Sequence, residues 1–95
     1  MLTDEVIVYI KRSVLCWLAT SSKENVPNVS PKEVFTYTDS NTILVANIAS
    51  PQTVKNIKQN EKVCISFIDV FVQKGFQLKG TARIVTKSEA IFTEL

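Results

Sequence analysis

Hydrophobic and polar residues alternate over several short stretches of the chain, and this pattern predicts strands. The clearest alternation covers 75–85, where Phe76, Leu78, Ala82 and Ile84 are separated by polar residues. A period of two is typical of a strand with one buried face. The same pattern, together with continuous apolar runs, predicts strands at 14–20, 28–38, 42–48 and 62–70.

Two of these strands carry more specific expectations. The run 14–20 is continuously apolar, so we expect it to be buried on both faces. The stretch 28–38 contains Pro31, which cannot donate a ladder hydrogen bond and therefore places the strand at an edge or a bulge. The residues expected to share one face of this strand are Val29, Phe35 and Tyr37.

Helices are expected before, between and after the strands. Asp4 and Glu5 precede an apolar pattern that ends at Lys11 and Arg12, the charge order that a helix dipole favours. Ser50 followed by Pro51 is a preferred helix start and predicts a helix over 51–60. A capping box at 86–89 starts a last helix that reaches the end of the chain. We therefore expect one antiparallel barrel domain over 1–95 whose C-terminal part is missing here.

The apolar content indicates a partner. Apolar residues make up 45% of this small chain, more than so small a body readily buries. Val70, Phe71 and Val72 lie between two expected strands, where a polar turn would be usual. This trio is either an extension of a strand or a dimer contact, and we favour the dimer contact.

Charge and composition exclude several classes of function. The net charge is +2 with scattered basic residues, so neither nucleic acid nor an anionic membrane is an expected partner. With no histidine and only Gly75 and Gly80, common zinc sites, His-activated nucleophiles and glycine-rich phosphate loops are excluded. Cys16 and Cys64 lie in apolar runs and are expected to be free thiols, with a disulfide as the alternative. Without a leader or spanning segment, a cytoplasmic protein is expected.

The start of the middle helix is a candidate anion site. Its first turn carries no acid, and Thr53 occupies the position where a capping box has a carboxylate. Helix N–H groups there can bind a phosphate, although an ordinary helix start has the same Ser-Pro sequence. Ser30 and Lys32, which flank Pro31, are further candidates, with solvent-facing side chains as the alternative.

Together these segments resemble the pyridoxamine 5′-phosphate oxidase-like family of FMN-binding split barrels. The stretches that carry the resemblance are Leu18-Ala19-Thr20, Val26 to Lys32, Leu44 to Thr53, Asn56-Ile57, Asn60 to Val63 and Phe76 to Ala82. The resemblance implies a mainly β split barrel with short helices that forms a homodimer, with FMN bound at the subunit interface. It also implies that the FMN phosphate contacts Ser50, Gln52 and Thr53 on one side and Ser30 and Lys32 on the other. Ala46 and Asn47 would lie along the flavin.

The sequence also departs from the family in ways that bear on substrate. Authentic pyridoxamine phosphate oxidases have Arg where this chain has Ser30, and a basic pair where it has Gln52 and Thr53. They also carry a C-terminal segment for pyridoxal phosphate. The resemblance thus implies an FMN-dependent oxidoreductase of unassigned substrate, or a flavin carrier, in which Lys32 is the one weak candidate for acid–base chemistry. The alternative is a flavin-free barrel that serves as a binding or dimerisation module.

Overall fold

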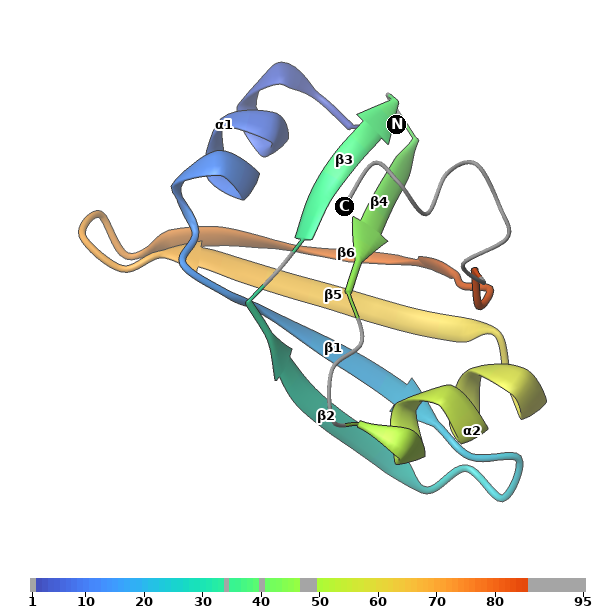
Figure 1. Cartoon of the computed structure of the whole chain (residues 1–95). Coiled ribbons are helices and arrows are strands. Elements are labelled where there is room, and N and C mark those ends of the chain that lie inside the picture. The colour runs from blue at the N-terminus through green and yellow to red at the C-terminus, as the bar shows by residue number, and fades with distance from the viewer. Residues whose placement is uncertain (1, 34, 40, 47–49, 86–95) are drawn as a thin grey trace.

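The computed structural model describes residues 2–33, 35–39, 41–46 and 50–85, which form two antiparallel sheets and two helices (Figure 1). The elements in chain order are α1 (Asp4–Arg12), β1 (Cys16–Ser21), β2 (Pro27–Lys32), β3 (Phe35–Asp39), β4 (Thr42–Val45), α2 (Pro51–Gln59), β5 (Lys62–Asp69) and β6 (Lys74–Thr81). One sheet has the order β2-β1-β5-β6, and the second is the β3–β4 hairpin. This arrangement is the split antiparallel barrel that the sequence predicts.

The core lies between the inner face of the four-stranded sheet, helix α1 and the β3–β4 hairpin. Val6, Ile10, Cys16 and Phe67 are buried there, and Cys16 pairs across the strands with Phe67. The partly buried residues packed on this centre are Leu2, Tyr9, Phe35, Tyr37, Ile43, Ile65, Phe76 and Leu78. Because side chains alternate along a strand, the neighbours of the inward residues point to the other face of the sheet, which we call the outer face.

Helix α1 forms as its sequence predicts. The Val6 N–H donates to Thr3 Oγ1 at 3.2 Å, which satisfies one of the open donors at the helix start. Asp4 and Glu5 lie in the first turn, and the last turn is basic, so both ends suit the helix dipole. Val6 and Ile10 are four residues apart and therefore bury one face of the helix.

The stretch predicted as one strand over 28–38 is two strands in different sheets. Strand β2 ends at Lys32 and pairs with β1, whereas β3 begins at Phe35 and pairs with β4. The predicted shared face is therefore wrong: Val29 lies exposed on the outer face, while Phe35 and Tyr37 pack on the core. Alternation of apolar and polar residues predicts a strand, but it does not show at which residue the chain leaves one sheet and enters another. The placement of Pro31 is confirmed, because β2 is an edge strand.

Strand β1 also differs from expectation, because only one of its faces is buried. Cys16, Leu18 and Thr20 are buried, but Trp17 is 44% exposed on the outer face and Val14 precedes the strand. The apolar trio at 70–72 forms a hairpin turn between β5 and β6, so it is not a strand extension. The alternation over 75–85 is confirmed, although β6 ends at Thr81.

Helix α2 is confirmed at Pro51–Gln59, and the hairpin partner predicted at 42–48 is seen as β4, which ends at Val45. The last predicted helix and Asn47 lie outside the described residues. Within the described part of the chain, neither helix is long and apolar enough to cross a membrane.

The two cysteines are free thiols on opposite faces of the sheet. Cys16 points into the core, where burial raises the pKa of its thiol to about 11. Cys64 is half-buried on the outer face, where its thiol donates to Gln77 Oε1 at 3.7 Å.

We therefore expect the two thiols to react at very different rates. At pH 8, roughly 0.1% of Cys16 would be thiolate, and no reagent reaches its buried sulfur. Titration of native protein with a chromogenic disulfide at pH 8 should detect one thiol per chain within minutes, and two in denaturant. A Cys64→Ser variant that still reacts when native would contradict this assignment.

Candidate functional site

Helix α2 packs on β1 and β2 and brings its first turn close to β2 (Figure 1). Ser50 is the N-cap residue, but its side chain makes no capping hydrogen bond to the helix backbone. Pro51 follows at the first helical position, and the first turn contains no acid. The helix start is thus positive through its dipole and has no carboxylate of its own to neutralise it.

Three hydroxyl groups meet at this helix start. Ser50 Oγ lies 2.6 Å from Thr53 Oγ1, and Ser30 Oγ lies 3.3 Å from the same Thr53 oxygen. Thr53 is only 1% exposed, whereas Ser30 and Ser50 are half-buried. The structure thus brings together Ser30, Ser50 and Thr53, three of the residues that the family resemblance places around the phosphate. In this hydroxyl cluster, Ser30 and Ser50 are the members nearer to solvent, and Thr53 joins them.

A second polar contact fixes the helix on the sheet one turn further along. Asn56 Nδ2 donates to Thr20 Oγ1 at 3.0 Å, and Gln52 Nε2 donates to Asn56 Oδ1 at 2.8 Å. Asn56 is 1% exposed and Thr20 is also buried. Sequence reasoning did not single out this pair as functional. The available signal was spacing, because Gln52 and Thr53 precede Asn56 by four and three residues, the separations at which side chains meet on a helix.

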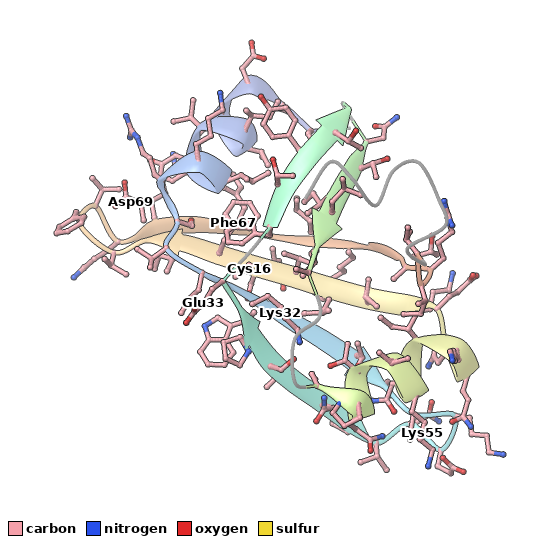
Figure 2. The ribbon with its side chains drawn as sticks, in the orientation of Figure 1. Cys16, Lys32, Glu33, Lys55, Phe67 and Asp69 are labelled. Atoms are coloured by element: carbon pink, nitrogen blue, oxygen red, sulfur yellow. The ribbon has the colours of Figure 1, made fainter. Side chains whose placement is uncertain are left out.

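Lys32 is a buried cation on the same face of β2 as Ser30. It lies two residues beyond Ser30 and pairs across the strands with Cys16. Only 3% of it is exposed, and Figure 2 shows it on the interior side of the sheet together with Cys16 and Phe67. Burial lowers the pKa of the Lys32 ammonium, since desolvation penalises the charged form. Its positive charge in turn favours the Cys16 thiolate slightly, but burial has the larger effect on the pKa of that thiol.

The remaining predicted residues are more loosely connected to this site. Gln52 is exposed, and its printed contact is with Asn56 rather than with the hydroxyl cluster. Ala46 follows β4 and is half-buried, and Asn47 lies outside the described residues. Among the described residues, no cluster of acids and cysteines could hold a metal ion. The site therefore offers hydroxyl groups, a helix N-terminus and one buried cation, which suits an anionic group such as a phosphate.

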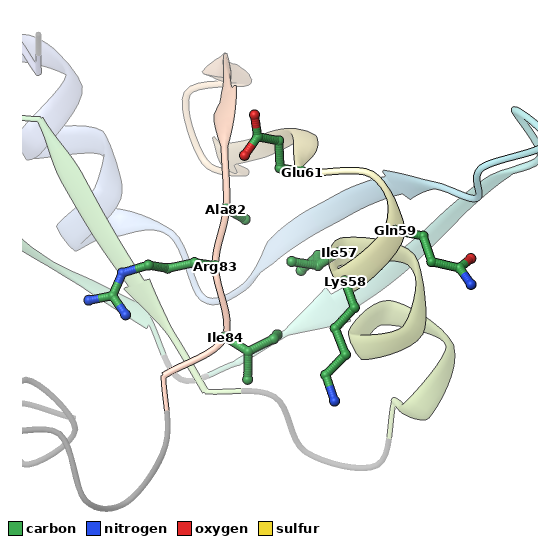
Figure 3. Close-up of a pocket in the computed structure, with 7 residues that line it drawn as sticks. All are labelled: Ile57, Lys58, Gln59, Glu61, Ala82, Arg83 and Ile84. Carbon is green, nitrogen blue, oxygen red and sulfur yellow. The ribbon is translucent and has the colours of Figure 1, made fainter.

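Two shallow grooves lie elsewhere and contain none of the predicted site residues. One, of about 370 Å³, runs between the C-terminal half of α2 and the segment after β6 (Figure 3). It is lined by Ile57, Lys58, Gln59, Glu61, Ala82, Arg83 and Ile84. The other, of about 560 Å³, is lined by the ends of β1, β5 and β6, including Lys62, Cys64 and Lys79. Because both lie away from Ser50 and Lys32, they do not extend the site.

Comparison with known proteins places the chain among similar sequences and folds. The family described as "Pyridoxamine 5′-phosphate oxidase" matches residues 2–95. An uncharacterized protein of Methanocaldococcus jannaschii, MJ0282, is 30% identical over 90 residues, which are 93% of this chain and 59% of that protein. The chain thus spans less than two thirds of the length of this curated relative.

Solved structures show the same fold. HupZ of Group A Streptococcus is 30% identical with a TM-score of 0.85, over 98% of this chain and 74% of that one. HutZ, the heme storage protein from Vibrio cholerae, is 20% identical with a TM-score of 0.76, over 99% of this chain and 70% of that one. At this lower identity, HutZ is evidence for the fold alone.

We expect the contact between Asn56 and Thr20 to be a main anchor of α2. In an Asn56→Leu variant the Thr20 hydroxyl loses its hydrogen bond while buried, which costs about 1–3 kcal/mol of unfolding free energy. Urea denaturation followed by circular dichroism measures this loss. Lys55→Ala changes an exposed side chain of the same helix and should cost less than about 0.5 kcal/mol. Equal losses in the two variants would show that Asn56 is not an anchor.

Proposed function

The chain belongs to the pyridoxamine 5′-phosphate oxidase-like family, and from this premise we propose that it binds FMN as a homodimer and acts as an FMN-dependent oxidoreductase. The observation that carries the proposal is the acid-free start of α2, which faces the Ser30 hydroxyl of β2 on the same strand as a buried lysine, Lys32. FMN, when bound, would supply the hydride chemistry, and the protein would supply orientation and electrostatics.

The donor set fits the phosphate of FMN. The helix dipole and the open N–H groups of a first turn favour a dianion, and hydroxyl groups can donate to its oxygens. Ser30 and Ser50 are accessible enough to make such contacts, whereas Thr53 is buried behind them. We therefore assign Ser30 and Ser50 to direct contact with the phosphate, and Thr53 to positioning their hydroxyl groups.

Lys32 would act through its charge. A buried ammonium interacts more strongly with a neighbouring anion than an exposed one does, because the surrounding dielectric constant is low. Lys32 would therefore stabilise negative charge on the ligand and could hold a proton near it. Gln52, Ala46 and Asn47 remain proposed contacts along the ligand. Pyridoxamine phosphate oxidation is not proposed, since Ser30, Gln52 and Thr53 stand where that activity uses cationic residues.

If this site binds the phosphate, substitution of Thr53 should change the affinity for FMN but not the affinity for riboflavin. Thr53→Val removes the hydroxyl that orients Ser30 and Ser50. Their hydrogen bonds to the charged phosphate, each worth roughly 1.5–3 kcal/mol, should weaken, so FMN should bind about ten- to hundredfold more weakly. Riboflavin, which lacks the phosphate, should bind Thr53→Val and wild type equally. Thr53→Glu should weaken FMN further, because its carboxylate would cap the helix and repel the phosphate.

The measurement is fluorescence titration of each variant with both flavins. Thr81→Val, an exposed threonine at the far edge of the sheet, is the matched control and should match wild type. Equal losses of FMN and riboflavin in Thr53→Val would make Thr53 merely structural and would move the phosphate site toward Lys32. Wild-type protein that binds neither flavin would instead favour a flavin-free binding or dimerisation module.

Heme is a second ligand to be compared, because HutZ shares the fold and is named as a heme storage protein. Histidine is a common axial ligand of heme iron, and these 95 residues contain none. We therefore expect hemin to bind more weakly than FMN and without a sharp, saturable Soret shift at one equivalent. A stoichiometric Soret complex that FMN does not displace would reverse this ranking.

A further inference from the structure

The groove of about 560 Å³ at the ends of β1, β5 and β6 brings a thiol and two lysines together. Cys64 contributes the thiol, and the side chains of Lys62 and Lys79 are exposed. Lys79 pairs with Cys64 across β5 and β6, which places their Cβ atoms about 5 Å apart on the outer face of the sheet. Lys62 lies two residues before Cys64, on the same face and about 7 Å along the strand. The thiol therefore has one lysine across the sheet and another along its own strand.

The Cys64 thiol is held at the surface of the sheet and is open on the side of β1. On that side Cys64 pairs with Ala19, whose side chain is a single methyl group. The thiol is half-buried and donates to Gln77 Oε1 at 3.7 Å, a contact on the outer face. Cys16, by contrast, is completely buried in the core. Of the two cysteines, only Cys64 can meet a ligand without a rearrangement of the sheet.

The charge of the groove is positive. Its lining residues all belong to the described part of the chain, and Lys62 and Lys79 are the charged ones among them. Glu61, the acid next to Lys62 in sequence, lines the other groove instead. Two ammonium groups without an acid between them attract anions. The volume lies within the roughly 300–1,000 Å³ of small-molecule sites, so the groove suits a small ligand that carries carboxylates.

We propose that this groove admits a small anionic disulfide and that Cys64 forms a mixed disulfide with it. The carboxylates of the ligand would face Lys62 and Lys79. The Cys64 thiolate attacks one sulfur of the ligand, a bond between the two sulfurs forms, and the disulfide bond of the ligand breaks. The second half of the ligand leaves with the bonding electron pair and takes up the proton that Cys64 lost to water. Cys64 is thereby oxidised and the released thiol is reduced, so no further oxidant is required.

The lysines would contribute at two stages of this exchange. Before the reaction they raise the local concentration of an anionic ligand. During the reaction the negative charge of the thiolate spreads over three sulfur atoms, and nearby ammonium groups stabilise that charge. The groove shares no residue with the hydroxyl cluster or with Lys32, so this modification site is independent of flavin binding.

Disulfides of opposite charge test the proposal. Native protein is incubated at pH 7.5 and low salt with glutathione disulfide, which is anionic, or with cystamine, which is cationic, and adducts are followed by intact-protein mass spectrometry. Relative to a neutral free thiol, wild type should prefer glutathione disulfide at least fivefold. The preference should fall at least tenfold in the double variant Lys62→Gln/Lys79→Gln, because the anionic reagent loses attraction and the cationic one loses repulsion. High salt should shift wild type in the same direction.

The matched control is Lys55→Gln, which removes an exposed lysine of α2 that lies outside the groove. This variant should keep the wild-type preference, and circular dichroism should show that all lysine variants are folded. Cys64→Ser should form no adduct when native. An adduct on native Cys64→Ser, a native wild type that forms none, or an equal preference in wild type and the double variant would each overturn the proposal.

Discussion

The two-residue period of β1 determines what each side of this molecule can do. Cys16 and Thr20 point inward, where Cys16 meets Phe67 in the core and the Thr20 hydroxyl accepts from Asn56 of α2. Trp17 points outward and is 44% exposed on the outer face of the sheet. A shift of one residue in the pairing would bury Trp17 and expose Cys16 and Thr20. The core, the docking of α2 and the outer surface therefore all depend on one register.

Most elements could be predicted from sequence because each has a local cause. Helix α1 has its cap at Thr3 and its charges in dipole order, and β6 has a clean alternation. The break between Lys32 and Phe35 has only a short local signal, because two polar residues, Lys32-Glu33, and two apolar residues, Val34-Phe35, interrupt the alternation there. Only pairing with distant strands decides that β2 joins β1 and β3 joins β4. The same lack of pairing information explains why Trp17 was expected to be buried.

Only part of the candidate site could be predicted from the sequence, because several of its contacts join residues that are far apart in the chain. The start of α2 is visible locally, because Ser50, Pro51 and an acid-free first turn are adjacent in sequence. Its contact with Ser30 spans 23 residues, and its second anchor, between Asn56 and Thr20, spans 36. Ser30 was singled out because it flanks Pro31, and the family resemblance added to that prediction, whereas Asn56 and Thr20 were read as ordinary residues of their elements. Buried polar pairs of this kind become visible only when the burial of both partners is known.

The chemistry of the site differs in kind from one built on cationic side chains. Guanidinium groups bind a phosphate through full charges in a fork geometry, which gives strong and directional contacts. Here the proposed phosphate contacts are hydroxyl groups and a helix N-terminus, which offer partial charges, with Lys32 as the buried full charge nearby. Hydroxyl groups rotate and can also accept hydrogen bonds, so their orientation must be fixed by neighbours. Thr53, bonded to both Ser30 and Ser50, meets that requirement, so in the proposed site a residue too buried to touch the ligand would still affect how tightly a phosphate binds.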